Sequence, residues 1–143
     1  MSWATDYHAA VLAVDEENQT LLLIDDNHSF PLWKFPGGGG EEGETPFETA
    51  VREYEEETGI VIATESLTLV SQVEIKADGN RMRNDHTKYF FFAKVDSLAG
   101  HKAVSDDGER VALFALQEIE HMLDLNEKYR QFYMDAKHAG LVP

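Results

Sequence analysis

The stretch GETPFETAVREYEEETGI, which begins at Gly43, constrains the fold of this chain more than any other part of the sequence. It carries the marks of one helix with defined ends. Thr45 is a favourable N-cap, and Glu48 stands three residues later, as in a capping box. Pro46 occupies the first helical position, where its missing N–H costs nothing. A glycine follows Thr58 as a C-terminal stop. We therefore expect a helix from Pro46 to Thr58.

Glutamates are dense in this stretch, which holds six of them and one arginine in 18 residues. Like charges at i,i+4 spacing destabilise a helix, so the clustering needs a reason. At about 100° per residue, Glu53, Glu56 and Glu57 fall within about one-third of the helix circumference. Three carboxylates at that spacing suit a hard divalent cation such as Mg²⁺ or Mn²⁺. The alternative is a solvated helix face without a ligand.

The remaining positions of the helix predict which side is buried. Apolar and β-branched residues gather on a side away from the acids: Phe47, Val51, Tyr54 and Thr58. We expect this stripe to face the core, so that the acidic face looks away from it. Small residues, Thr49 and Ala50, lie in the acidic sector one turn earlier and predict open space beside the carboxylates.

Short β-type runs flank the helix on both sides. The predicted strands are Tyr7–Asp15, Thr20–Asp26, Leu32–Pro36, Ser66–Lys76, Thr87–Val95 and Arg110–Leu116. The glycines at 37–40 predict a loop. Two more helices are predicted over residues 117–125 and 126–140, the second with an apolar face of Tyr129, Phe132, Tyr133 and Ala136. This mixture predicts an α/β fold, an α/β/α sandwich with a mixed central sheet, in a single domain over residues 1–143.

Charge and composition exclude several classes of partner. The net charge of −15 would repel nucleic-acid backbones and anionic membranes, but it permits a small phosphorylated substrate if a cation lies between. Cysteine is absent, which excludes disulfides and thiolate metal sites and fits a reducing compartment. We see no signal peptide and no apolar run long enough to cross a bilayer. The sequence therefore predicts a cytoplasmic protein.

The segment from Gly38 to Ile60 fits the pattern G-x5-E-x7-R-E-U-x-E-E-x-G-U, in which U is a bulky apolar residue. The matching residues are Gly38, Glu44, Arg52, Glu53, Tyr54, Glu56, Glu57, Gly59 and Ile60. This pattern resembles the Nudix box, the signature of the Nudix hydrolase superfamily. Only Tyr54 is a loose fit, because it stands where the family has an aliphatic residue. The lead-in WKFPGG and the later LFALQEI are also similar to segments of many members.

The resemblance implies the Nudix fold and hydrolysis of a nucleoside diphosphate linked to another group, with Mg²⁺ as cofactor and Mn²⁺ as a possible substitute. It implies that Glu53, Glu56 and Glu57 hold the metal, with the carbonyl of Gly37 as a further ligand. Arg52 would orient the carboxylates, and Glu44 would fix the loop against the helix. Either Glu53 or Glu57 is a candidate general base. The catalytic set is therefore Glu53, Glu57, Arg52 and Glu44.

Candidates outside these residues are less defined. Glu109 precedes a predicted strand and could reach the metals from a loop, or it could be a surface acid. Arg81 and Arg83, with Lys88, form the only concentration of basic residues and could contact phosphates or simply be solvated. Gly38 and Gly39 permit close backbone approach to the helix or to a phosphate. The aromatic residues Trp33, Phe35 and Phe90 could stack on a base, although strand aromatics more often belong to the core.

The sequence does not determine the substrate or the oligomeric state. A nucleoside triphosphate, intact or oxidised, a nucleotide sugar or ADP-ribose would each fit, and marks of particular subfamilies, such as a proline near Ala77, are absent. A non-catalytic nucleotide sensor with the same fold is the alternative, but such proteins usually lose residues of the box. We expect a small phosphorylated nucleotide as partner and either a monomer or a homodimer.

Overall fold

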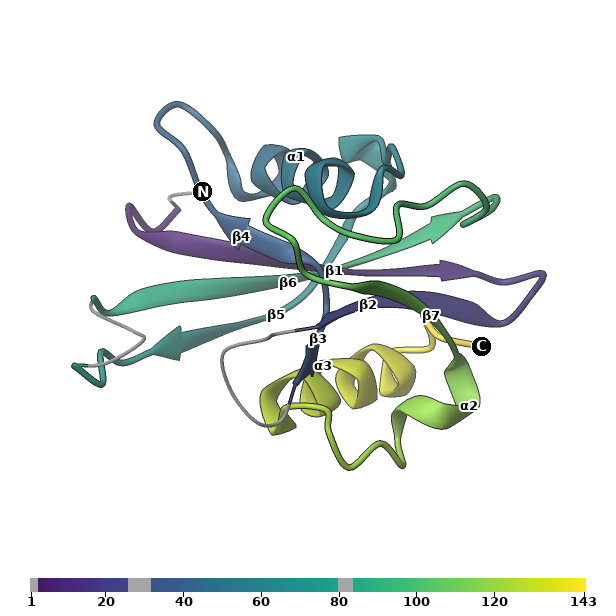
Figure 1. Ribbon diagram of the computed structural model, residues 1–143. Coiled ribbons are helices and arrows are strands. Elements are labelled where there is room, and N and C mark those ends of the chain that lie inside the picture. The colour runs from purple at the N-terminus through teal and green to yellow at the C-terminus, as the bar shows by residue number, and fades with distance from the viewer. Residues whose placement is uncertain (1–2, 26–31, 80–83) are drawn as a thin grey trace.

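Two helices enclose a mixed β-sheet in the computed structural model, which describes residues 3–25, 32–79 and 84–143. Helix α1 (Pro46–Thr58) covers one face of the sheet and helix α3 (Glu127–His138) covers the other (Figure 1). The predicted α/β/α sandwich is therefore confirmed. Within the described ranges, no helix has both the length and the apolar character needed to cross a membrane.

The sheet is built around β1, which lies parallel to β6 and antiparallel to β2 and β4. In the described part of the chain it has seven strands, in the order β3-β2-β1-β6-β5, with β4 added beside β1 and β7 beside β2. Their bounds are Tyr7–Asp15 (β1), Thr20–Asp25 (β2), Trp33–Lys34 (β3), Gly37–Gly39 (β4), Thr68–Ile75 (β5), His86–Val95 (β6) and Val111–Ala115 (β7). A short 3₁₀ turn, Thr64–Ser66, precedes β5.

The ends of α1 lie where the local residues predict them. Thr45 Oγ1 accepts the backbone N–H of Glu48 at 3.2 Å, and Glu48 Oε1 accepts the N–H of Thr45 at 2.9 Å, which completes the capping box. At the other end, Gly59 has a left-handed φ of 79° and its N–H donates to Glu55 O at 2.8 Å.

The glycine run is a strand, not the predicted loop. Gly37–Gly39 pair with β1 at residues 8–10 as the antiparallel strand β4. A Cβ atom at Gly37 would lie 2.0 Å from the carbonyl oxygen of Ala9, so only glycine can come this close to β1. The pairing depends on contacts with a distant strand, which the local sequence does not reveal.

The helix predicted over residues 117–125 is also wrong beyond its first turn. Helix α2 covers only Leu116–Ile119. The guanidinium of Arg130, on α3, donates to the carbonyl oxygens of Ile119 at 3.2 Å and Glu120 at 2.7 Å, and also to Met122 O. These carbonyls are therefore satisfied by a side chain instead of by a continuing helix. Helix α3 buries the predicted face of Tyr129, Phe132, Tyr133 and Ala136.

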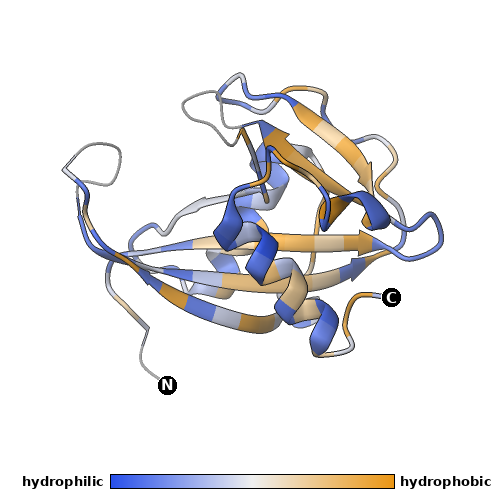
Figure 2. Ribbon diagram, turned by 90° about the horizontal axis from the view of Figure 1, so that it is seen from below, coloured by the Kyte–Doolittle hydropathy of each residue, from blue (hydrophilic) through white to orange (hydrophobic). Residues whose placement is uncertain are grey.

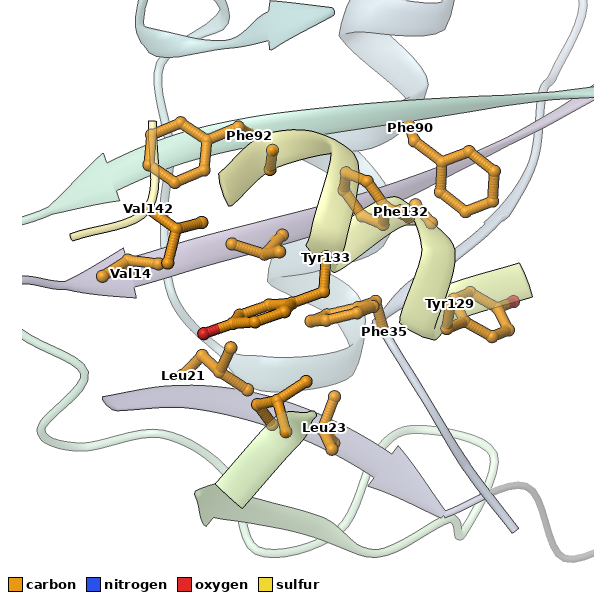
Figure 3. Packing of buried hydrophobic residues seen from close by; sticks show 14 of the residues in the cluster. Val14, Leu21, Leu23, Phe35, Phe90, Phe92, Tyr129, Phe132, Tyr133 and Val142 are labelled. Atoms are coloured by element: carbon orange, nitrogen blue, oxygen red, sulfur yellow. The ribbon is translucent and has the colours of Figure 1, made fainter. Parts of the chain in front are cut away.

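A hydrophobic core lies on each face of the sheet, and hydrophobic residues concentrate in the strands (Figure 2). On the α3 side, Phe35, Phe90 and Phe132 pack against one another (Figure 3). Trp33, Phe35 and Phe90 are all buried, so these aromatic side chains belong to the core. The smaller core under α1 contains Tyr54.

Replacing Tyr54 with phenylalanine is expected to raise the free energy of unfolding by about 1 kcal/mol. Tyr54 is fully buried and its hydroxyl has no hydrogen-bond partner, so the polar oxygen is desolvated without compensation. Urea unfolding measures the effect. Tyr133→Phe is the matched control, because the Tyr133 hydroxyl donates to Leu116 O at 3.1 Å and its loss should destabilise the protein. A destabilised Tyr54→Phe variant would contradict this account.

Candidate active site

Helix α1 presents part of its acidic face to the protein. Thr49, Ala50 and Glu57 are all buried, and only 7% of Glu57 is exposed. The expectation that the acidic face looks away from the core is therefore wrong. The small side chains let the helix approach β1 closely, and the glycines of β4 leave room for the carboxylates behind them.

Glu57 is held by the glycine strand. The backbone N–H of Gly37 donates to Glu57 Oε1 at 2.6 Å. Burial raises the pKa of Glu57 to about 8; the Gly37 hydrogen bond and the charge of Lys34 oppose this shift, and the charges of Glu53 and Glu109 add to it. Among the described residues, the positive charge near this carboxyl group does not offset its burial, so the protonated form is favoured below about pH 8.

Glu53 lies against the same strand. A Cβ atom at Gly38 would lie 2.5 Å from the carboxyl carbon of Glu53. The close approach that Gly38 permits is therefore to the helix side chain. Burial raises the pKa of Glu53, and its hydrogen bond from Arg52 opposes the rise.

Replacing Gly38 with alanine is expected to lower turnover by about 100-fold, because the methyl group would push the Glu53 carboxylate out of position. Thermal melting checks that the fold is kept. Glu53→Asp provides the control, since a shorter acid removes the clash: on that background Gly38→Ala should cause little further loss. Fully additive losses in the double variant would contradict the proposed clash.

Arg52 joins the loop before the helix to the acids on it. Its Nε donates to Glu44 at 2.6 Å, and its terminal nitrogens donate to Glu53 at 3.0 Å, to Glu56 at 3.3 Å and to Gly39 O at 3.0 Å. The Arg52 hydrogen bond lowers the pKa of Glu44 to about 2. Glu44 also accepts the hydroxyl of Thr49 at 2.8 Å. The guanidinium therefore orients several carboxylates at once.

Glu109 reaches the acid cluster from the loop that precedes β7, far from α1 in the sequence. Only 8% of it is exposed, and its charge contributes to the raised pKa of Glu57. Lys34, on β3, lies 3.5 Å from Glu109 Oε2. The loop is tied to the end of α1 because the backbone N–H of Lys102 donates to Thr58 O at 2.7 Å. The structure therefore places Glu109 with the acids of α1 and not on an open surface.

The predicted trio is not assembled into a finished cation site. Among the described residues, no three acidic or imidazole groups converge as metal ligands would. Glu56 is the most exposed of the three, and Arg52 holds both Glu56 and Glu53. A bound cation would compete with Arg52 for these oxygens. Arg81 and Arg83 lie outside the described residues.

A groove of about 610 Å³ runs along the outer side of α1 and meets the acid cluster at Arg52 and Glu56. Lys102 forms part of its other wall. Sequence reasoning missed Lys34, although it stands in the WKFPGG lead-in, and it also missed Asp107, whose charge helps to raise the pKa of Glu53. Neither residue belongs to the box pattern.

A mixed sheet between helices, with an acidic helix packed on a glycine strand, is the arrangement of the Nudix fold. The NUDIX domain family profile matches residues 6–136 of this chain. The protein therefore belongs to the NUDIX domain family.

Relatives and solved structures agree with this assignment. A Xenopus laevis protein, "Nucleoside diphosphate-linked moiety X motif 6", is 45% identical over 60 residues, which are 41% of this chain and 28% of that protein. The ADP-ribose pyrophosphatase of Methanocaldococcus jannaschii is 29% identical over 127 residues, or 88% of this chain and 72% of the relative. The crystal structure of a MutT protein from Methanosarcina mazei Go1 has the same fold, with a TM-score of 0.72, 21% identity and 94% of each chain covered.

Proposed function

We propose that this protein is a Mg²⁺-dependent hydrolase that cleaves the pyrophosphate linkage of a nucleoside diphosphate linked to another group. The buried carboxyl group of Glu57 carries the proposal, since the charges of Glu53 and Glu109 add to the cost of ionising it and Lys34 offsets that cost only in part. Such an acid is costly to keep in a fold without a ligand, so a functional role is favoured.

The donor set fits a hard divalent cation. The groups are carboxylate oxygens, with the carbonyl of Gly37 nearby, and Mg²⁺ and Mn²⁺ prefer oxygen ligands. The acids around the site outnumber Arg52 and Lys34: they are Glu41, Glu44, Glu53, Glu56, Glu57 and Glu109. In this proposal Glu53, Glu56, Glu57 and Glu109 hold the metal. A bound dication lowers the pKa of a water ligand and offsets charge on a phosphoryl group.

The chain's own groups then perform the proton transfer and the positioning. A carboxylate, Glu57 or Glu53, takes a proton from the attacking water. The water oxygen bonds to phosphorus, the anhydride P–O bond breaks, and its electron pair leaves with the second phosphate. Arg52 orients the acids, and Glu44 holds Arg52. Gly38 leaves room for the Glu53 carboxylate. Gly39, Arg81 and Arg83 stay predicted phosphate contacts.

ADP-ribose is the favoured substrate, because the archaeal pyrophosphatase relative matches 88% of this chain. A nucleoside triphosphate, including an oxidised one, and a nucleotide sugar are the competing candidates. A panel of these compounds with Mg²⁺, read by phosphorus NMR, tests the proposal. ADP-ribose should yield AMP and ribose 5-phosphate, and EDTA should stop the reaction.

Saturable nucleotide binding without any product would overturn the proposal and favour a non-catalytic sensor. The intact box argues against that alternative, since all nine pattern positions are filled.

A further inference from the structure

Lys34 occupies an unusual place between the acids of the site. It lies on the two-residue strand β3, opposite Ile24 of β2, three residues before the first glycine of β4. Its Nζ lies 3.5 Å from Glu109 Oε2, and its charge also acts on Glu57. One lysine therefore acts on two acidic residues that lie far apart in the sequence.

The same ammonium group would compete with a metal ion. Both Lys34 and a divalent cation are attracted by Glu57 and Glu109, and a cation bound to these acids would repel the lysine. The side chain has room to respond, because 25% of it is exposed and its four-carbon stem is flexible.

The surroundings of Lys34 indicate what its ammonium group could contact once a cation has displaced it from Glu109. Its charge also helps to lower the pKa of His8, which lies on β1 opposite the glycine strand. That strand separates the acid cluster on the α1 side from His8, since a Cβ atom at Gly39 would lie 3.6 Å from the His8 ring. A phosphate bound beside a metal at Glu109 would lie within reach of this partly exposed, flexible side chain.

Building on the proposed function, we propose that Lys34 is a substrate-binding residue with two alternating partners. In the metal-free protein it pairs with the carboxylate of Glu109 and lies near the carboxyl group of Glu57. When divalent cations hold those carboxylates, its Nζ binds a non-bridging oxygen of the substrate's phosphates. Lys34 thus keeps the acid cluster folded before loading and supplies a positive charge to the ligand after it.

The first half of the proposal predicts the affinity for metal alone. Mn²⁺ binding is measured by electron paramagnetic resonance of the free ion, with no nucleotide present. Lys34→Met should bind Mn²⁺ about three- to tenfold more tightly than the unmodified protein, because a competing charge is gone. Lys34→Arg keeps the charge and should stay within about twofold. Lys94→Met is the matched control, because Lys94 is exposed and pairs with Glu16 at 3.2 Å.

The second half predicts the affinity for phosphate. AMP is titrated calorimetrically into protein saturated with Mn²⁺. Lys34→Met should bind AMP about tenfold more weakly, Lys34→Arg should recover most of the affinity, and Lys94→Met should match the unmodified protein. A lysine that only holds Glu109 in place would give the opposite result for the metal, since its loss would weaken Mn²⁺ binding.

Unchanged or weaker Mn²⁺ binding by Lys34→Met overturns the proposal, and so does unchanged AMP binding. Thermal melting of each variant confirms that it is folded, and Lys34→Gln, which also removes the charge, repeats both measurements if Lys34→Met does not fold. Because neither measurement uses turnover, the result is separate from the hydrolysis assay. If no compound is cleaved but both shifts are seen, the hydrolase proposal fails and Lys34 stands as a ligand-binding residue.

Discussion

Replacing Glu57 with glutamine is expected to lower kcat by about 1,000-fold or more, and to stabilise the metal-free protein at pH 8. The loss of turnover follows because the neutral amide cannot accept a proton and is a poor ligand for a dication. The gain in stability follows from burial, since Glu57 is 7% exposed and has a raised pKa. Glutamine keeps the shape of the side chain without its charge.

The pH dependence of stability has a definite sign. The pKa of Glu57 is about 8 in the folded metal-free protein, against an ordinary value of 4.5. Between these values the folded state binds a proton that the unfolded state does not, so stability falls as pH rises from 4.5 through 8. This contribution should amount to about 2–4 kcal/mol at pH 8.5 and should be absent in Glu57→Gln.

Urea unfolding in EDTA from pH 5 to 8.5 measures this slope, and steady-state kinetics with Mg²⁺ measure the turnover. Glu55→Gln is the matched control, because Glu55 is exposed on the same helix and should alter neither property. Equal slopes for the unmodified protein and Glu57→Gln would show that Glu57 does not hold a proton in the folded state. Unchanged turnover would remove Glu57 from the catalytic set.

Local signals predict the helix that carries the site. The capping residues, the first-turn proline and the terminal glycine set both ends of α1 through contacts within a few residues, so its bounds at Pro46 and Thr58 are confirmed. The Nudix box likewise predicts the family, because its fixed residues lie on this one continuous segment. Strand β1 is predicted with equal success, since its apolar run is buried on both faces.

Contacts between distant segments explain what the sequence could not predict. The buried side of α1 depends on the approach of the glycines of β4, which themselves pair with β1. The early end of α2 depends on Arg130, a residue of the next helix. Lys34 meets Glu109 only after the sheet has formed, and 75 positions separate them in the chain. None of these contacts produces a periodic pattern of residues in the sequence.

The identity of the substrate is also a property that the sequence could not predict. The candidate phosphate contacts outside the box, Arg81 and Arg83, lie outside the described residues. The box sets the reaction type because metal and phosphate chemistry need one compact group of acids. In the proposed reaction, the group linked to the diphosphate would be recognised by residues outside the box, where a single sequence offers no fixed spacing to compare.

Replacing Arg52 with methionine is expected to destabilise the metal-free protein by about 3 kcal/mol, because Glu44, Glu53 and Glu56 would lose their shared partner. The contribution of Glu44 also has a pH signature. Its pKa is lowered to about 2, so the stabilisation is present above pH 4.5 and is lost as pH falls through about 2. In Arg52→Met, the free energy of unfolding should therefore no longer show this loss between pH 4.5 and about 2.

Mg²⁺ should restore part of the stability of Arg52→Met, because a dication at Glu53 and Glu56 replaces the missing positive charge. Arg130→Met is the matched control: Arg130 donates to backbone carbonyls far from the acids, so its loss should cost the same with Mg²⁺ or with EDTA. Unfolding of both variants in the two buffers separates the cases. If Mg²⁺ helps both variants equally, the acids oriented by Arg52 are not the ones that bind the metal.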